Sequence, residues 1–169
     1  MGNWKPANNL KTHRPNESEL TFVSGVETKN ADGAITKANV RAAVAVLKQM
    51  FADVGNPTVE VLVTLGEFGS MHFGGGWTAG NAAAHERTMG RFALQTADGK
   101  PTDTTGAGDC YRGSYCGARY GLKQTVDQAM HWAAAAGSLA VEVEGAMPSM
   151  PTKAKIAERA ANPVSSPNL

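Results

Sequence analysis

Excess charge of one sign, cysteine and long apolar runs are all scarce in this sequence. Sixteen Lys and Arg residues against fifteen Asp and Glu residues leave a formal net charge of +1. The chain therefore lacks the basic field that attracts nucleic acid or an acidic membrane. No apolar run reaches the ~20 residues of a membrane-spanning helix, and the first residues lack the apolar core of a signal peptide. We expect a soluble cytoplasmic protein with neither nucleic acid nor membrane as a partner.

The two cysteines, Cys110 and Cys116, lie six positions apart on an expected helix. Six residues correspond to about 1.7 helical turns, so the two thiols should lie on different faces, out of easy disulfide reach. The four histidines show no metal-ligand spacing. We therefore expect reduced thiols, which fits a reducing compartment.

The middle of the chain has the periodicity of an α/β protein. Between residues 39 and 54 the apolar residues recur every three or four positions, which predicts an amphipathic helix. Residues 59–65 are rich in β-branched side chains and predict a buried strand. A helix followed by a buried strand is the repeat of a sheet covered by helices, so we predict an α/β fold.

The second half of the chain is mostly helical in its pattern. We predict a helix over residues 111–120, a second capped by Thr125, and a last one over residues 153–161 capped by Thr152. The domain should occupy residues 15–161. Residues 1–14 are expected to be a poorly ordered lead or a short strand, and residues 162–169 a flexible tail.

Residues 73–100 carry the weakest pattern. Gly74, Gly75 and Gly76 lack the spacing of a phosphate-binding P-loop, so a flexible turn is the favoured interpretation. His72 alternates with apolar neighbours, and we interpret it as a surface residue. The nearest candidate for a strand before residue 103 is the segment 92–94.

Residues 103–109 read D-T-T-G-A-G-D and precede an expected helix. Glycines let backbone N–H groups approach a ligand, and the start of a helix leaves its first N–H groups unpaired, which favours an anion. Asp109 at the same turn could take a proton from a hydroxyl while these amides hold phosphoryl charge. The alternative is a tight turn whose aspartate caps a helix.

Two further segments also allow a structural or a functional interpretation. Asn16 and Glu19 have the spacing of a capping box at the start of a short helix. Residues 64–70 place a hydroxyl and two glycines after the predicted strand, where α/β sheets bind ligands. A hairpin turn explains the same residues, and the two interpretations can both hold.

The turn at residues 103–109, together with the A-x-A-A-A-A and G-A-x-x-S-M-P patterns that follow it, resembles the ribokinase-like (PfkB) carbohydrate kinases. The resemblance runs from about residue 15 to about residue 156. It implies the C-terminal half of a three-layer ribokinase-like fold, with the N-terminal half and the small β lid missing. It also implies a regular apolar strand just before residue 103.

The resemblance implies roles for individual residues. Asp109 would be the catalytic base, with the amides of Gly106, Ala107 and Gly108 as the anion hole. Asn16, Thr64 and Gly66 would bind the nucleotide, and Glu19 would organise Mg²⁺ through water. In potassium-dependent members a monovalent cation lies behind the anion hole. Its ligands here would be Asp103, Thr105, Ala140, Val143, Gly145 and Ser149.

The implied activity is ATP-dependent phosphorylation of a sugar hydroxyl, with Mg²⁺, and K⁺ as a further ion. Adenosine or fructose-type substrates stay open, because the residues that discriminate between them belong to the missing half. The alternative is a truncated fragment that only binds nucleotide or a partner. Half a sheet should also expose apolar surface, so we expect self-association or a homodimer.

Overall fold

A computed structural model describes residues 9–162 of the chain, in two compact units. The N-terminal unit contains residues 9–66 and 70–88, and the C-terminal unit contains residues 67–69 and 89–162. The expected tail at residues 163–169 and the first eight residues of the expected lead lie outside the described residues.

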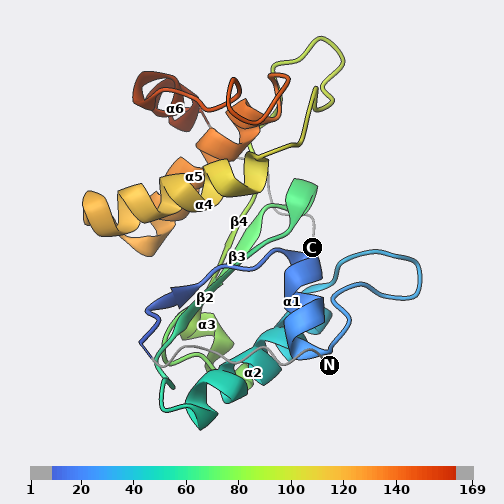
Figure 1. The fold of residues 1–169 in the computed structure, drawn as a ribbon, viewed down its shortest axis with the longest axis vertical. Coiled ribbons are helices and arrows are strands. Elements are labelled where there is room, and N and C mark those ends of the chain that lie inside the picture. The colour runs from blue at the N-terminus through green and yellow to red at the C-terminus, as the bar shows by residue number, and fades with distance from the viewer. Residues whose placement is uncertain (1–8, 163–169) are drawn as a thin grey trace. The chain divides into compact units, whose positions relative to one another are not determined.

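The N-terminal unit contains a mixed sheet and its covering helices (Figure 1). The strand order is β1-β2-β3-β4, with β1 parallel to β2 and β2 antiparallel to β3. This arrangement confirms the α/β class and the hairpin after the predicted strand. The elements in chain order are β1 (Thr12–His13), α1 (Glu17–Ser24), α2 (Lys37–Asp53), β2 (Glu60–Thr64), β3 (Ser70–Phe73), α3 (Ala82–His85) and β4 (Glu86–Met89), with 3-10 turns at Gly66–Phe68 and Ala79–Asn81.

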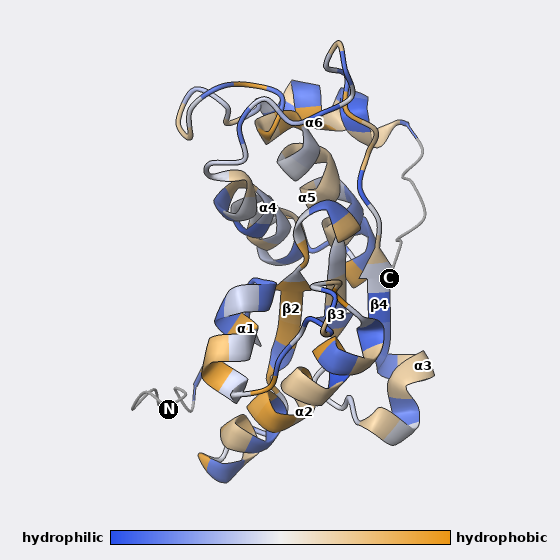
Figure 2. Ribbon diagram, turned by 90° about the vertical axis from the view of Figure 1, so that its right-hand side faces the viewer, coloured by the Kyte–Doolittle hydropathy of each residue, from blue (hydrophilic) through white to orange (hydrophobic). Residues whose placement is uncertain are grey.

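Helix α2 and strand β2 form where the sequence predicts them. Thr36 caps α2, because its side chain accepts a hydrogen bond from the Asn39 amide. The apolar buried residues of α2 recur every three or four positions, as predicted, and the hydropathy colours of Figure 2 show the helix's mixture of apolar and polar residues. Strand β2 has four consecutive buried residues, as expected for a strand covered on both faces. The buried residues are Val40, Ala43, Val44, Leu47 and Phe51, together with Lys48, whose Nζ donates to the Val59 carbonyl oxygen at 2.8 Å.

One expectation about the N-terminal unit is wrong, because His72 is not a surface residue. It is 3% exposed, since β3 is buried along its whole length, and its Nε2 lies 3.4 Å from Glu60 Oε2. The glycine-rich segment after β3 is a turn, as favoured, and it is closely packed, since a Cβ added at Gly75 would lie 2.6 Å from the Thr58 carbonyl oxygen. Residues 12–13 form β1, which agrees with the short strand that was one of the two expectations for residues 1–14.

The C-terminal unit is helical. Its elements are α4 (Ala107–Cys116), a π-helical turn at Gly117–Gly121, α5 (Val126–Ala140) and α6 (Lys153–Ala160). Thr125 and Thr152 cap α5 and α6 as predicted. Helix α4 starts four residues earlier than predicted, directly after Gly106. Both cysteines are free, Cys110 buried and Cys116 partly exposed, so the expectation of reduced thiols is confirmed.

The segment before the D-T-T-G-A-G-D turn differs from the expectation. Residues 90–106 contain neither helix nor strand, so the expected strand at 92–94 is wrong. Phe92 is buried and its ring packs edge-on against His131, with centroids 5.1 Å apart. Within residues 9–162 the last strand is β4 at residues 86–89, inside the stretch with the weakest sequence pattern.

Candidate active site

The N-x-x-E segment forms the predicted capping box at the start of α1. Asn16 Oδ1 accepts a hydrogen bond from the Glu19 amide at 2.7 Å, and the Asn16 amide donates to Glu19 Oε2 at 2.8 Å. Two amides that the helix start would leave unpaired are thereby satisfied. The structural interpretation of this motif is confirmed, and its role toward a nucleotide stays a prediction.

The same segment lies beside the end of β2. The Thr64 amide donates to the Pro15 carbonyl oxygen at 3.1 Å, and Asn16 pairs with Thr64 as a parallel bridge. Gly66, two residues on, has φ +56°, a left-handed conformation that favours glycine. The N-terminal unit thus brings together Asn16, Thr64 and Gly66, with Glu19 on the first turn of α1.

In the C-terminal unit, the Asp103 carboxylate organises the D-T-T-G-A-G-D turn. Its Oδ1 accepts from the Thr105 amide and its Oδ2 from the Gly145 amide, each at 2.8 Å. The hydrogen bonds from the Thr105 backbone and side chain, and then the one from the Gly145 backbone, lower the pKa of Asp103 below its usual 3.8. Asp103 therefore links the turn to the loop after α5 as an ionised carboxylate.

Gly106 ends this turn directly before the start of α4. Its φ of +78° is left-handed, and it is the residue directly before the helix. A Cβ at this position would lie 3.1 Å from the Ala146 Cβ, so both the backbone angle and the space favour glycine. The amides of Ala107 and Gly108 belong to the first turn, where helix geometry provides no i−4 carbonyl. The Ala107 amide donates to the Thr104 carbonyl oxygen at 3.3 Å.

Asp109 is the third residue of α4, and its side chain is 81% exposed. A carboxylate in the first turn is stabilised by the helix dipole, so its position also fits a structural role. Arg112 lies one turn further, with Nη1 3.7 Å from Asp109 Oδ1. This arginine was not among the site residues predicted from the sequence. The i,i+3 spacing of the two residues was the available signal.

The loop that follows α5 is hydrogen-bonded to the same turn. The Val141 carbonyl oxygen accepts from the Thr102 amide at 2.7 Å and from the Asp103 amide at 3.3 Å. Ser149 is buried, and its hydroxyl donates to the Ala146 carbonyl oxygen at 2.9 Å. These contacts bring together the two segments that hold all six expected ligands of a monovalent cation: Asp103, Thr105, Ala140, Val143, Gly145 and Ser149.

Two of those expected ligands already use their carbonyl oxygens. Ala140 accepts from the Val143 amide at 3.5 Å, and Gly145 accepts from the Ser149 amide at 3.2 Å. A carbonyl oxygen has two lone pairs, so one hydrogen bond leaves room for a cation contact. The donor set is carbonyl and hydroxyl oxygen, which suits a hard cation.

A cavity of about 330 Å³ in the C-terminal unit contains none of the predicted site residues. Its lining is mainly apolar and includes Leu122, Trp132 and Ile156, with Lys153 at its wall. Among residues 9–162, no three His, Cys, Asp or Glu side chains gather closely enough to hold a metal ion. In the same range no helix has the length and apolar character needed to cross a membrane.

The chain belongs to the pfkB family of carbohydrate kinases, because that family's model matches residues 8–153. It is similar to the ribokinase of Arabidopsis thaliana, with 32% identity over 142 residues, which are 84% of this chain and 31% of the relative. It is also similar to the ribokinase of Haemophilus influenzae, with 30% identity over 144 residues, 85% of this chain and 39% of the relative. The chain therefore spans between about 31% and 39% of these curated relatives.

The solved structures show the same fold. The structure of Arabidopsis thaliana ribokinase complexed with ribose and ATP has a TM-score of 0.70 and 26% identity to this chain. The match covers 92% of this chain and 42% of that one. These findings confirm the resemblance carried by the D-T-T-G-A-G-D turn and the ribokinase-like α/β fold that it implies.

Proposed function

We propose that the chain is the nucleotide-binding and catalytic part of an ATP-dependent kinase that phosphorylates a sugar hydroxyl. The observation that carries this proposal is the geometry of residues 103–109. A left-handed glycine ends the turn, the helix starts at the next residue, and an exposed carboxylate lies in its first turn. Membership of the pfkB family and similarity to a ribokinase solved with ribose and ATP support it.

Asp109 acts as the general base in this proposal. The sugar hydroxyl oxygen attacks the γ-phosphorus of ATP, the bond from that phosphorus to the bridging oxygen breaks, and ADP leaves. The hydroxyl proton moves to the Asp109 carboxylate. The amides of Gly106, Ala107 and Gly108 stabilise the negative charge on the transferred group, and the dipole of α4 adds to that field.

The nucleotide is bound by Asn16, Thr64 and Gly66, which the N-terminal unit gathers at one end of β2. Glu19 would help to hold Mg²⁺ through water. Its Oε2 already accepts the Asn16 amide, but a carboxylate can accept about four hydrogen bonds. Capping the helix and orienting a hydrated ion are therefore compatible tasks for this side chain.

A monovalent cation such as K⁺ is the proposed occupant of the oxygen cluster formed by the D-T-T segment and the loop after α5. It would offset the negative charge that accumulates during transfer. In this scheme Asp103 holds the two segments together through the Thr105 and Gly145 amides.

A second candidate function is binding of nucleotide or a partner without catalysis. The observation that favours it is the exposure of large apolar side chains such as Phe22, Leu122 and Met147, which a partner or a second copy of the chain could cover. Self-association therefore belongs to this second proposal. Sedimentation velocity tests it, and a sharp monomer peak would contradict it.

The test is a phosphate-transfer assay from ATP to a panel of sugars and nucleosides, run on this chain and on any longer form. The kinase proposal predicts transfer to one pentose or hexose by a form that contains residues 9–162. Transfer to fructose would place the substrate among the hexoses, and transfer to adenosine would make it a nucleoside within the same family. Nucleotide binding without transfer in every form would favour the second candidate.

A further inference from the structure

The backbone that leads into the turn lacks the support a strand would have. Residues 90–106 form neither helix nor strand, and Asp103 lies within this segment. A regular strand is held by a ladder of backbone hydrogen bonds to its neighbours. Other contacts must position this segment if the turn is to keep a fixed geometry.

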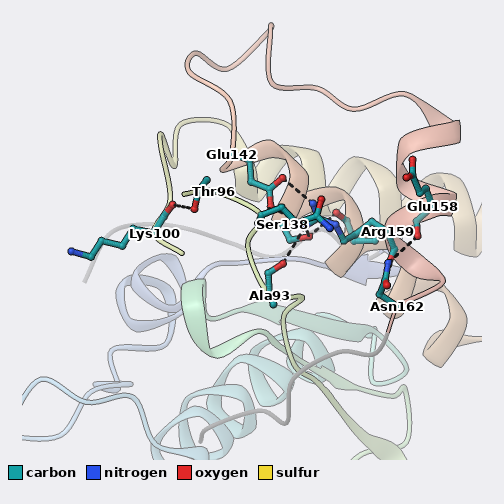
Figure 3. A network of polar contacts seen from close by, with 10 residues as sticks. Ala93, Thr96, Lys100, Ser138, Glu142, Glu158, Arg159 and Asn162 are labelled. Atoms are coloured by element: carbon teal, nitrogen blue, oxygen red, sulfur yellow. Dashed lines mark hydrogen bonds and ion pairs between the residues drawn. The ribbon is translucent and has the colours of Figure 1, made fainter. Parts of the chain in front are cut away.

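A buried ion pair lies beside this segment. Arg159 of α6 donates from Nη2 to Glu142 Oε2 at 2.8 Å and from Nη1 to Glu142 Oε1 at 3.0 Å (Figure 3). The side chains are 4% and 14% exposed, respectively. Arg159 Nη1 also lies 3.3 Å from the hydroxyl oxygen of Ser138 in α5. The two-pronged geometry fixes both side chains relative to each other.

Both partners of the pair also contact the irregular segment. Arg159 Nη1 donates to the Ala93 carbonyl oxygen at 3.4 Å, and Glu142 Oε1 accepts from the Gln95 amide at 2.7 Å. The pair thus provides hydrogen-bond partners for the Ala93 carbonyl and the Gln95 amide, two residues apart. A neighbouring strand would provide partners at the same spacing through its backbone. Figure 3 shows Ala93, Ser138 and Glu142 gathered around the Arg159 side chain.

The contacts continue from the pair to the candidate active turn. Val141, next to Glu142, accepts the amides of Thr102 and Asp103 through its carbonyl oxygen. The Asp103 carboxylate then holds the amides of Thr105 and Gly145. All of these residues belong to the C-terminal unit.

We propose that Glu142 and Arg159 are positioning residues for the turn at residues 103–109. The pair takes the place of a supporting strand and fixes both the approach to the turn and the loop after α5. Its effect on catalysis rests on the proposed function, but its effect on the geometry of the turn does not.

The experiment measures amide hydrogen exchange in this chain and in the Glu142→Gln variant. Glutamine keeps the size of the side chain and an oxygen for the Gln95 amide, but it loses the charge that holds Arg159. We expect exchange at Gln95, Thr105 and Gly145 to become at least about tenfold faster, because local opening exposes these amides.

Glu86→Gln provides a matched control. Arg41 and Glu86 form an equivalent two-pronged pair in the N-terminal unit, with N–O distances of 2.9 and 2.8 Å. This variant should leave exchange at Thr105 and Gly145 within about twofold of the wild type, since local openings are independent. The proposal is overturned if Glu142→Gln leaves these amides at the wild-type rate. It is equally overturned if all protected amides of the C-terminal unit accelerate by the same factor.

Arg159→Lys supplies a second variant if Glu142→Gln does not fold. Lysine keeps the charge but cannot form two parallel bonds to a carboxylate. We expect exchange at the same amides to be faster than in the wild type, and wild-type rates would contradict the proposal. In a form with kinase activity, Glu142→Gln should lower kcat more than it raises KM for ATP. Absence of kinase activity in every form that contains residues 9–162 would refute the proposed function while leaving the exchange test valid.

Discussion

The two units of this chain build their interiors in different ways. In the N-terminal unit the buried positions of α2 and β2 hold large side chains such as Leu47, Phe51 and Leu62. In the C-terminal unit the buried face of α5 consists mainly of alanines, among them Ala133 and Ala136. Large side chains stabilise a unit by burying apolar surface area. Small side chains bury less area but let helices pack closely, so polar contacts contribute relatively more to holding the loops in place.

This difference matters for function because the predicted residues of each unit depend on different forces. Asn16, Thr64 and Gly66 lie at the end of a strand whose side chains pack in the apolar core of the N-terminal unit. The turn at residues 103–109 is held by hydrogen bonds that the Asp103 carboxylate and the Val141 carbonyl oxygen accept, and in our proposal also by the Glu142–Arg159 pair. Truncation of a large buried side chain should therefore destabilise the N-terminal unit most. Replacement of a left-handed glycine, or loss of one polar contact, should most affect the turn in the C-terminal unit.

Truncation of a large side chain in the N-terminal unit should have the greatest effect on stability. Phe51→Ala removes a ring that is completely buried in α2, and we expect the free energy of unfolding to fall by about 3–5 kcal/mol. Denaturant unfolding measures the loss. Phe22→Ala is the control, because that ring is 70% exposed and its removal should change stability by less than about 0.5 kcal/mol. Equal losses in the two variants would contradict the account.

Two glycines of the C-terminal unit should respond to alanine in opposite directions. Gly106→Ala forces a left-handed residue and places a Cβ 3.1 Å from that of Ala146, so we expect a loss of about 1–2 kcal/mol. Gly113 lies inside α4 with nothing within 4 Å of an added Cβ, so Gly113→Ala should stabilise by up to about 1 kcal/mol. Thermal unfolding of both variants checks the signs. A stabilised Gly106→Ala variant would show that the turn does not need its left-handed residue.

Asn16→Asp separates the two roles of the N-x-x-E motif. Aspartate caps a helix about as well as asparagine, so stability should change by only a few tenths of a kcal/mol, whereas Asn16→Ala should cost roughly 1 kcal/mol. The added negative charge should repel phosphate, so affinity for Mg-ATP should fall in Asn16→Asp. Calorimetric titration with Mg-ATP gives the affinity. An unchanged affinity in both variants would reduce the motif to a helix cap.

The pH dependence of stability should also differ between the units. Burial lowers the pKa of Lys48 from 10.5 to about 8, so the unfolded chain binds more protons between these values and stability should rise from pH 8 toward 10.5.

The pKa of Asp103 is lowered by the hydrogen bonds from Thr105 and Gly145. The stability it contributes is present above 3.8 and is lost as pH falls through its folded pKa. Lys48→Met should remove the alkaline rise and Asp103→Asn the acid loss, both read from unfolding at several pH values.

Repeating local patterns were sufficient to predict much of the fold. The spacing in α2, the β-branched run in β2 and the threonine caps of α5 and α6 each depend on neighbours in the sequence. His72 was misjudged because alternation alone does not show whether a second face is covered. Strand β4 was missed because its residues, Glu86–Met89, are polar and partly exposed.

The candidate site was predictable only where a motif is local. The capping box of Asn16 and Glu19 and the turn before Asp109 could be read directly from their spacing. The Glu142–Arg159 pair could not be predicted, because its partners lie 17 residues apart, one in the loop after α5 and one in α6. The segment that they contact, at Ala93, is distant from both in the sequence. Long-range polar contacts have no sequence period, and they hold the segment that the sequence left without regular structure.

The most direct test of the central claim is the Asp109→Asn variant in a form of the protein that transfers phosphate. Asparagine keeps the size of the side chain and its compatibility with the first turn of α4, but it cannot accept the hydroxyl proton. We predict that kcat falls by about a hundredfold to ten-thousandfold, the usual effect of a positioned base, while affinity for Mg-ATP is nearly unchanged. A wild-type kcat in Asp109→Asn would contradict the assignment of Asp109 as the base and leave it as a residue that only stabilises the helix start.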